Sequence, residues 1–297
     1  MRVFVTGASG WIGSATVSAL LGAGHRVVGY ARSDAAAAKV AATGAEVRRG
    51  ALEDLDALRA GAAESEAVVH LGYSHDFSRM AEAAELDRRA IEVLGTALEG
   101  TGRPLVVASG MLGLAPGKVA TEEDSPDPAV HTRAANARVA LSFAPRGVRS
   151  SIVRFAPTVH GAGDYGFIAF LVGIAREKGV SGYVGDGSNA WPAVARSDAA
   201  RLVHLALERA PAGAVLHGVA EEGVPTRSIA EVIGRRLGVP AVRVEPELAA
   251  AHFGWLGRIF AADCRGSSTR TRELLGWEPT EPGLLEDLER GRYFDRP

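Results

Sequence analysis

The sequence predicts an α/β fold: a doubly wound parallel sheet with helices on both faces, followed by a small C-terminal portion. Short β-branched runs alternate with longer helix-like segments through the first half of the 297 residues, which is typical of strands joined by crossover helices. The runs 67–71 and 105–107 are nearly continuously apolar, as expected for strands buried on both faces. A glycine-rich turn follows the first strand, at the edge where such sheets bind ligands.

The order of the elements also predicts how the chain is divided. Residues 1–156, with 193–220 returning to them, are expected to form the nucleotide-binding domain, and residues 157–192 and 221–297 the substrate-binding portion, because glycines, prolines and aromatics crowd the chain after the last strand. Helices return at 198–210 and 228–237. The strands expected in the first domain are 2–6, 26–30, 46–48, 67–71, 104–108 and 150–155, and the helices are 12–23, 35–42, 54–60, 77–99 and 130–143.

Composition excludes several classes of function. Lys and Arg together number 33 and Asp and Glu 35, so the net charge is -2, without the basic excess of a nucleic-acid-binding protein. The single cysteine, Cys264, can form neither an intrachain disulfide nor a thiolate zinc site, which favours a reducing, cytoplasmic location. No stretch reaches the roughly 18 apolar residues of a membrane span, and no apolar leader precedes the first strand. A small molecule is the expected partner.

The turn between the first strand and the first helix has the spacing of a dinucleotide-binding site. Gly7 permits a tight turn, Gly10 lets the backbone approach a pyrophosphate, and Gly13 lets the helix pack on the strand. The N-terminus of the helix offers free N–H groups to the anion. The other residues expected to contact the cofactor here are Ser9, Trp11 and Ile12.

The end of the second strand favours NADP(H) over NAD(H). A NAD-binding protein usually offers an acid to the ribose hydroxyls at this point, but the position is occupied by Ala31. Arg32 and Ser33 follow directly, and they can bind a 2′-phosphate through a charge-assisted contact and a hydroxyl donor.

The chain resembles the extended short-chain dehydrogenase/reductase family, including its atypical branches, over nearly its whole length. Besides the glycines, the resemblance rests on the segments 68–71, 106–109, 152–161, 193–200 and 275–279. It implies a Rossmann-type fold, with Leu52 beside the adenine and with Pro157 to Val159 closing over the nicotinamide. It also implies that the nicotinamide-ribose wall is lined by Leu71, Gly72 and Tyr73.

The Tyr-x-x-x-Lys catalytic pattern of this family is absent from the chain. The Tyr-x-x-x-Lys positions fall on Ala129 and Arg133; Arg133 can still hydrogen-bond the ribose, but a guanidinium does not titrate. The serine or threonine of the family falls near Gly110 or Met111, with Ser109 just before it. A substitute proton donor is therefore expected for a ketone, whereas an imine or an activated alkene can be reduced without one.

Three residues are the main candidates for that donor: Tyr73, His131 and Tyr165. Tyr73 is preferred because it follows the fourth strand at the cofactor wall. His75 and His160 are further alternatives. The spacing of His70, His160 and His204 does not predict a metal site.

These observations predict an NADPH-dependent reductase of a small or medium apolar metabolite bearing a ketone, imine or activated alkene. An NADP-binding redox sensor without activity, and a non-redox isomerase or cyclase, remain as alternatives. Helices 77–99 and 130–143 pair between subunits in many members of the family, which leaves a homodimer open. The aromatic residues that could line an apolar substrate cavity are Phe167, Phe170, Trp191, Phe253 and Trp255.

Overall fold

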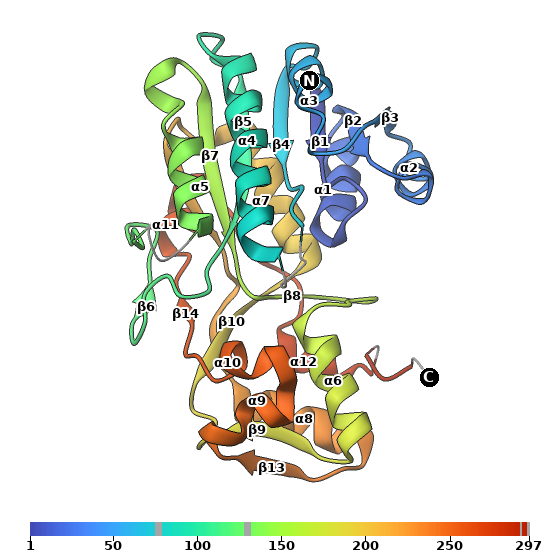
Figure 1. The fold of residues 1–297 in the computed structure, drawn as a ribbon, viewed down its shortest axis with the longest axis vertical. Coiled ribbons are helices and arrows are strands. Elements are labelled where there is room, and N and C mark those ends of the chain that lie inside the picture. Colours follow the sequence, from blue (N-terminus) through green and yellow to red (C-terminus); the bar gives the residue numbers. More distant parts are fainter. Residues whose placement is uncertain (75–78, 128–131, 292, 296–297) are drawn as a thin grey trace.

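The computed structural model describes residues 1–74, 79–127, 132–291 and 293–295. Its core is a seven-stranded parallel sheet in the order β11-β7-β5-β4-β1-β2-β3, with helices on both faces (Figure 1). The predicted Rossmann-type α/β fold is confirmed. The strands of this sheet are β1 (Arg2–Thr6), β2 (Arg26–Ala31), β3 (Glu46–Arg49), β4 (Ala67–His70), β5 (Pro104–Gly110), β7 (Arg149–Phe155) and β11 (Ala214–Gly218).

The two faces of this sheet carry separate sets of helices because successive strand residues point in opposite directions. On β1, Val3 and Val5 belong to the core cluster that includes helices α1 and α7. Phe4 between them belongs to the cluster formed with α3, α4 and α5. The helices of this part are α1 (Trp11–Gly22), α2 (Asp34–Ala41), α3 (Leu55–Ala63), α4 (Met80–Leu98), α5 (Thr132–Leu141) and α7 (Arg196–Arg209).

Helix boundaries follow local capping. Asp54, predicted as the first residue of a helix, is instead the N-cap of α3 and accepts a hydrogen bond from Ala57 N at 3.0 Å. The described part of the predicted helix 77–99 begins at Met80, and that of 130–143 is helical from Thr132 to Leu141. Residues 77, 78, 130 and 131 lie outside the described ranges.

The lower half of Figure 1 contains the smaller portion. A three-stranded sheet, β12-β10-β8, and two two-stranded sheets, β13-β9 and β14-β6, accompany its helices. The strands are β6 (Val119–Ala120), β8 (Thr158–His160), β9 (Ser181–Val184), β10 (Ala190–Ala195), β12 (Glu221–Pro225), β13 (Ala241–Val244) and β14 (Arg265–Gly266). Its helices are α6 (Phe167–Lys178), α8 (Thr226–Leu237), α9 (Ala249–Phe253), α10 (Gly257–Phe260) and α12 (Leu284–Glu289), with short 3-10 turns at Pro246–Leu248 and Gly254–Leu256. Helix α11 (Thr269–Leu275) packs beside β11 and α7 of the large sheet, and a further 3-10 turn, Ala144–Arg146, lies between α5 and β7.

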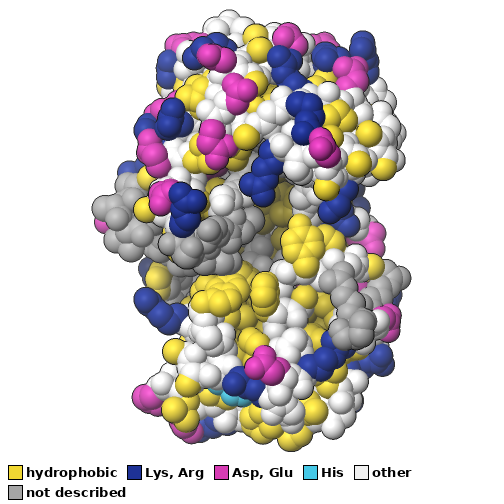
Figure 2. Space-filling model, turned by 45° about the vertical axis from the view of Figure 1, so that its right-hand side comes forward, with side chains coloured by type: hydrophobic (Ala, Val, Ile, Leu, Met, Phe, Trp, Pro, Cys, Tyr) yellow, Lys and Arg dark blue, Asp and Glu magenta, His cyan; other side chains and the backbone are white. Residues whose placement is uncertain are grey.

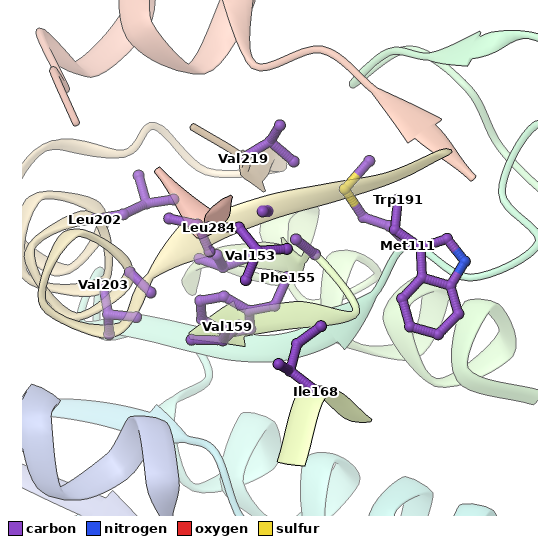
Figure 3. Close-up of a cluster of buried hydrophobic side chains, with 14 of the residues drawn as sticks. Met111, Val153, Phe155, Val159, Ile168, Trp191, Leu202, Val203, Val219 and Leu284 are labelled. Atoms are coloured by element: carbon purple, nitrogen blue, oxygen red, sulfur yellow. The ribbon is translucent and has the colours of Figure 1, made fainter. Parts of the chain in front are cut away.

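One continuous core joins the two halves. Val153 and Phe155 of β7 belong to the same buried cluster as Ile168 of α6 and Trp191 of β10. Figure 3 shows side chains of this cluster coming from the seven-stranded sheet, the three-stranded sheet and α7. The two halves therefore pack on each other through apolar side chains. The proposed domain boundaries at residues 156, 193 and 220 remain a prediction.

Candidate active site

The glycine-rich turn is shaped by close backbone approach. Gly7 has φ 67°, and a Cβ added to it would lie 2.7 Å from backbone atoms of Leu71 and Gly72 at the end of β4. A side chain at Gly13 would meet the carbonyl oxygen of Gly7 at 1.9 Å. At Gly10 the same oxygen would be 3.1 Å from the added Cβ, so a side chain at this position needs only a small shift of its neighbour. Only glycine fits at positions 7 and 13 without movement of the backbone.

The turn leaves backbone donors free at the start of α1. Gly10 N–H donates to Gly7 O at 2.9 Å, and Ser14 N–H, the first to bond within the helix, donates to Gly10 O at 3.0 Å. The N–H groups of residues 11–13 precede that bond and have no intrahelical acceptor. A concave set of free N–H groups at a helix N-terminus fits the pyrophosphate of a dinucleotide.

The end of β2 carries the charges of Arg32, Asp34 and the neighbouring Arg49. Arg32 is exposed, and Ser33 Oγ accepts a hydrogen bond from Ala36 N at 3.2 Å as the N-cap of α2. Asp34 lies one residue further on and forms a 3.0 Å ion pair with Arg49 at the end of β3. The hydroxyl proton of Ser33 stays available to a ligand, and Arg49 places a second guanidinium near this edge.

At the predicted adenine side, β2 is bonded to the loop after β3. Tyr30 donates its hydroxyl proton to Ala51 O at 2.9 Å, and burial raises the pKa of Tyr30 to about 12. A Cβ at Gly72 would lie 3.3 Å from Leu52 Cδ2. Leu52, in the loop after β3, thus lies against Gly72 just after β4, near the glycine-rich turn.

A buried chain of polar groups fixes the end of β4. Thr6 Oγ1 lies 2.8 Å from His70 Nδ1, and His70 Nε2 lies 3.0 Å from Asp87 Oδ1. Asn136 donates from Nδ2 to Asp87 Oδ2 at 2.6 Å, and Thr6 Oγ1 also accepts from Gly72 N at 3.1 Å. These bonds tie β1 and β4 to α4 and α5, so the segment from Leu71 to Tyr73 leaves the sheet in a defined direction.

Tyr73 and Arg133 meet beyond this chain of bonds. The guanidinium carbon of Arg133 lies 4.1 Å from the centroid of the Tyr73 ring, and Arg133 Nη2 donates to Ala108 O on β5 at 2.9 Å. Burial raises the pKa of Tyr73, and the charge of Arg133 opposes that rise. Ser109, the next residue on β5, is buried. The structure therefore brings together Tyr73 of the loop after β4 and Arg133 of α5, and it bonds Arg133 to the β5 residue that precedes Ser109.

Trp11 links the glycine-rich turn to the smaller portion. Its Nε1 donates to Val159 O at 2.7 Å, and the ring of Tyr165 stands against it edge-on, with centroids 5.7 Å apart. Arg196 stacks on the indole at 4.2 Å and donates from Nε to Trp11 O at 2.6 Å. Val159, which follows Pro157 in the predicted nicotinamide segment, is thereby joined to the turn.

Sequence analysis did not identify Arg196. It also donates from Nη2 to Ser14 Oγ at 2.6 Å, so it joins α7 to the first turn of α1. The residue occurs within a segment used only for the family resemblance, and an arginine in a chain so rich in arginine gives little local signal.

Two other predicted candidates have clear structural positions. His160 is buried, and its Nδ1 lies 3.1 Å from Asp287 Oδ2 of α12. Trp191 is fully buried against Phe167 and Phe260, so its interpretation as a cavity-lining side chain is replaced by a role in the core. His131, His75 and Ala129 lie outside the described residues.

Aromatic side chains continue from Tyr165 along α6. Phe170 and Trp255 are 48% and 45% exposed, and their rings meet edge-on with centroids 5.4 Å apart. Phe167 packs against the same tryptophan. Figure 2 shows hydrophobic side chains gathered across the middle of the displayed face, between the upper and lower halves.

The seven-stranded parallel sheet and the glycine-rich turn after β1 are those of a nucleotide-dependent enzyme of the epimerase/dehydratase type. The chain belongs to the NAD dependent epimerase/dehydratase family, whose sequence profile matches residues 3–217. The family and its reductase relatives indicate an oxidoreductase-type enzyme. In the described ranges, no helix is both long and apolar enough to span a membrane.

Individual relatives differ in what is known of them. An uncharacterised protein of Schizosaccharomyces pombe is 48% identical over 99% of this chain and 100% of its own length. The 4-hydroxy-2-methyl-3-oxo-4-farnesyl-3,4-dihydroquinoline-1-oxide ketoreductase of Stigmatella aurantiaca is 29% identical over 94% of this chain and 88% of its own. The structure of MoeE5 in complex with UDP-glucuronic acid and NAD has a TM-score of 0.74 and 25% identity, covering 97% of this chain and 96% of that one.

Proposed function

We propose that the protein is an NADPH-dependent reductase of a small or medium apolar metabolite, with a ketone as the preferred substrate group. The observation that carries the proposal is the contact of Tyr73 with Arg133 at the carboxyl edge of the sheet. The family's tyrosine and lysine positions are occupied by Ala129 and Arg133, and this contact brings a phenol from another element, Tyr73, next to the fixed positive charge of Arg133.

The cofactor would be held by the backbone of the glycine-rich turn and by side chains along the sheet edge. Free N–H groups at residues 11–13 would bind the pyrophosphate, Leu52 would contact the adenine, and Arg133 would hydrogen-bond the nicotinamide ribose. Reduced nicotinamide supplies a hydride when it is bound. Pro157 and Val159 would close over the ring, since Val159 is fixed to Trp11 by a 2.7 Å hydrogen bond.

The preference for NADPH rests on the end of β2. Ala31 leaves no acid at the usual ribose position, and Arg32 is exposed beside it. Among the described residues Asp34 is paired with Arg49 at 3.0 Å, which offsets the repulsion between that carboxylate and a phosphate. Arg32 and the hydroxyl of Ser33 would then bind the 2′-phosphate by charge-assisted hydrogen bonds.

Tyr73 would act as the proton donor. Its pKa is raised by burial, so the phenol is protonated at neutral pH and can serve as an acid. As hydride adds to the carbonyl carbon, the C=O double bond becomes a single bond to an oxyanion, which takes the phenolic proton of Tyr73. The guanidinium of Arg133, 4.1 Å from the ring centroid, stabilises the phenolate that remains.

An apolar substrate is supported by the aromatic residues beside this edge. Tyr165 packs against Trp11 at the turn, and Phe170 and Trp255 expose nearly half of their surface. Exposed aromatic faces next to a few polar groups are typical of sites for flat or apolar ligands.

The direct test begins with calorimetric titration of the full chain with NADPH, NADP⁺ and NADH. NADPH is expected to bind at least about tenfold more tightly than NADH. A panel of apolar ketones, cyclic imines and enones is then incubated with the NADPH-loaded protein, and loss of absorbance from the reduced nicotinamide is followed. Absence of binding would overturn the proposal, and binding without turnover of any class would favour a sensor.

A further inference from the structure

We propose a binding site for a divalent transition metal ion, Zn²⁺ foremost, formed by His25, His204 and Glu208. The three ligand atoms, one from each side chain, all lie within 4.8 Å of one another. His25 stands just before β2, and the other two residues are on α7. The glycine-rich turn begins α1 at its other end, roughly 18 Å away along the helix, so this site is separate from the proposed reductase site.

The local fold directs all three side chains to one point. His204 and Glu208 are four residues apart on α7, which places them on the same face of the helix. His25 follows the end of α1, where Gly24 has φ 84° and His25 N donates to Leu20 O at 3.0 Å. Because α1 and α7 belong to one packed core, this turn is held beside the end of α7.

The distances from Glu208 to the two histidines match those between ligands that share one metal ion. His25 Nε2 lies 3.3 Å from Glu208 Oε1, and His204 Nε2 lies 3.2 Å from the same oxygen. Two ligand atoms bound at about 2.0–2.1 Å in tetrahedral geometry are about 3.3 Å apart. Two imidazoles and a carboxylate form the donor set of open zinc sites, in which water occupies the fourth position.

The same contacts are poorly explained as ordinary hydrogen bonds. Nε2 of His25 and Nε2 of His204 both lie within ion-pair distance of Glu208 Oε1, but within the described residues neither contact has the geometry of a well-formed hydrogen bond. The His25 side chain is only 7% exposed, and a buried polar nitrogen without a partner costs free energy. A metal ion placed between the three groups satisfies both nitrogens.

The surroundings of His25 also suit a ligand. The His25 ring stands edge-on to the His204 ring, with centroids 5.4 Å apart, so the two imidazoles lie next to each other. His25 Nδ1 lies 3.3 Å from the Met1 amino nitrogen.

The test uses the full-length chain without a histidine tag, stripped with a chelator and titrated with ZnCl₂ by calorimetry. One Zn²⁺ per chain and a rise in Tm on adding Zn²⁺ are expected. Co²⁺ is expected to give the intense visible absorption of a tetrahedral site. Each of Glu208→Gln and His204→Gln is expected to lower the Zn²⁺ affinity by at least about tenfold.

His252→Gln is the matched control, because the Nε2 of His252 also lacks a hydrogen-bond partner among the described residues but lies on α9. Circular dichroism and gel filtration confirm that each variant folds. The inference is overturned if the chain binds no stoichiometric Zn²⁺, if both ligand variants keep the original affinity, or if the control loses as much affinity as they do. None of these outcomes depends on reductase activity.

Discussion

The carboxyl edge of the large sheet contains two regions that we propose recognise ligands by different means. At the glycine-rich turn, backbone atoms form the site, and an added methyl group at Gly13 would approach Gly7 O to 1.9 Å. Beyond β4, side chains form the site, and the contact of Tyr73 with Arg133 replaces the pattern usual in the family. The first region leaves no room for a side chain at Gly7 or Gly13, whereas the second depends on which side chains meet there.

This comparison indicates that a proton-donating side chain can change more readily than a phosphate-binding backbone. Backbone recognition of phosphate depends on sterics that a single Cβ disrupts. A proton donor needs only a suitable pKa and reach to the reacting atom, so it can be supplied from another element. The buried bonds from Thr6 through His70 to Asp87 connect the two regions.

The largest expected effect is at Tyr73. Tyr73→Phe is expected to lower kcat for ketone reduction by about 10²–10⁴-fold while leaving NADPH affinity unchanged, because only the phenolic proton is removed. Single-turnover kinetics and calorimetry measure the two quantities. Tyr165→Phe serves as the control, since its ring stands on Trp11. Equal losses in both variants, or a loss confined to Tyr165→Phe, would remove Tyr73 from the reaction.

The next effect tests the turn by sterics alone. Gly13→Ala is expected to lower the free energy of unfolding by about 3 kcal/mol and to weaken NADPH binding, because its Cβ would collide with the carbonyl of Gly7. Gly22→Ala, at the other end of α1, meets no atom within 4 Å and is the matched control. Urea unfolding and calorimetry give the values. Full cofactor binding by Gly13→Ala would show that the turn is not set by this contact.

A smaller loss of stability is expected at Thr6, which bonds the end of β1 to the end of β4. Thr6→Val would leave His70 Nδ1 and the Gly72 N–H without Thr6 Oγ1, which should cost about 1–3 kcal/mol of stability. Thr16→Val is the comparison, because Thr16 is equally buried and its hydroxyl donates only to Ile12 O of its own helix. Urea unfolding of both variants measures the difference. Equal losses would mean that the Thr6 bonds add nothing specific.

The smallest effect is expected at the 2′-phosphate. Arg32→Ala should weaken NADPH binding by about tenfold and leave NADH binding unchanged, because only NADPH carries the phosphate that the guanidinium would bind. Calorimetry with both nucleotides measures the preference. Arg243→Ala, an exposed arginine of β13, should change neither affinity. An unaltered preference in Arg32→Ala would contradict the selection of NADP(H) by that side chain.

Local sequence was sufficient to predict the sheet and the turn. Continuous apolar runs predict buried parallel strands because both faces are covered, and β1, β4 and β5 are found at the expected residues. The glycines of the turn recur every third residue at positions 7, 10 and 13, and the steric requirement at Gly13 comes from Gly7 of the same turn. The class of fold and the position of the glycine-rich turn followed from these short-range features.

Tertiary structure decided which distant side chains meet. The contacts of Arg196 with Trp11, of Tyr73 with Arg133, and of His25 with Glu208 each join residues far apart in the chain. No local pattern encodes such a pair, because the meeting point depends on how whole helices pack on the sheet. The sequence by itself determined the fold and the backbone site, and packing decided the side chains that give each site its chemistry.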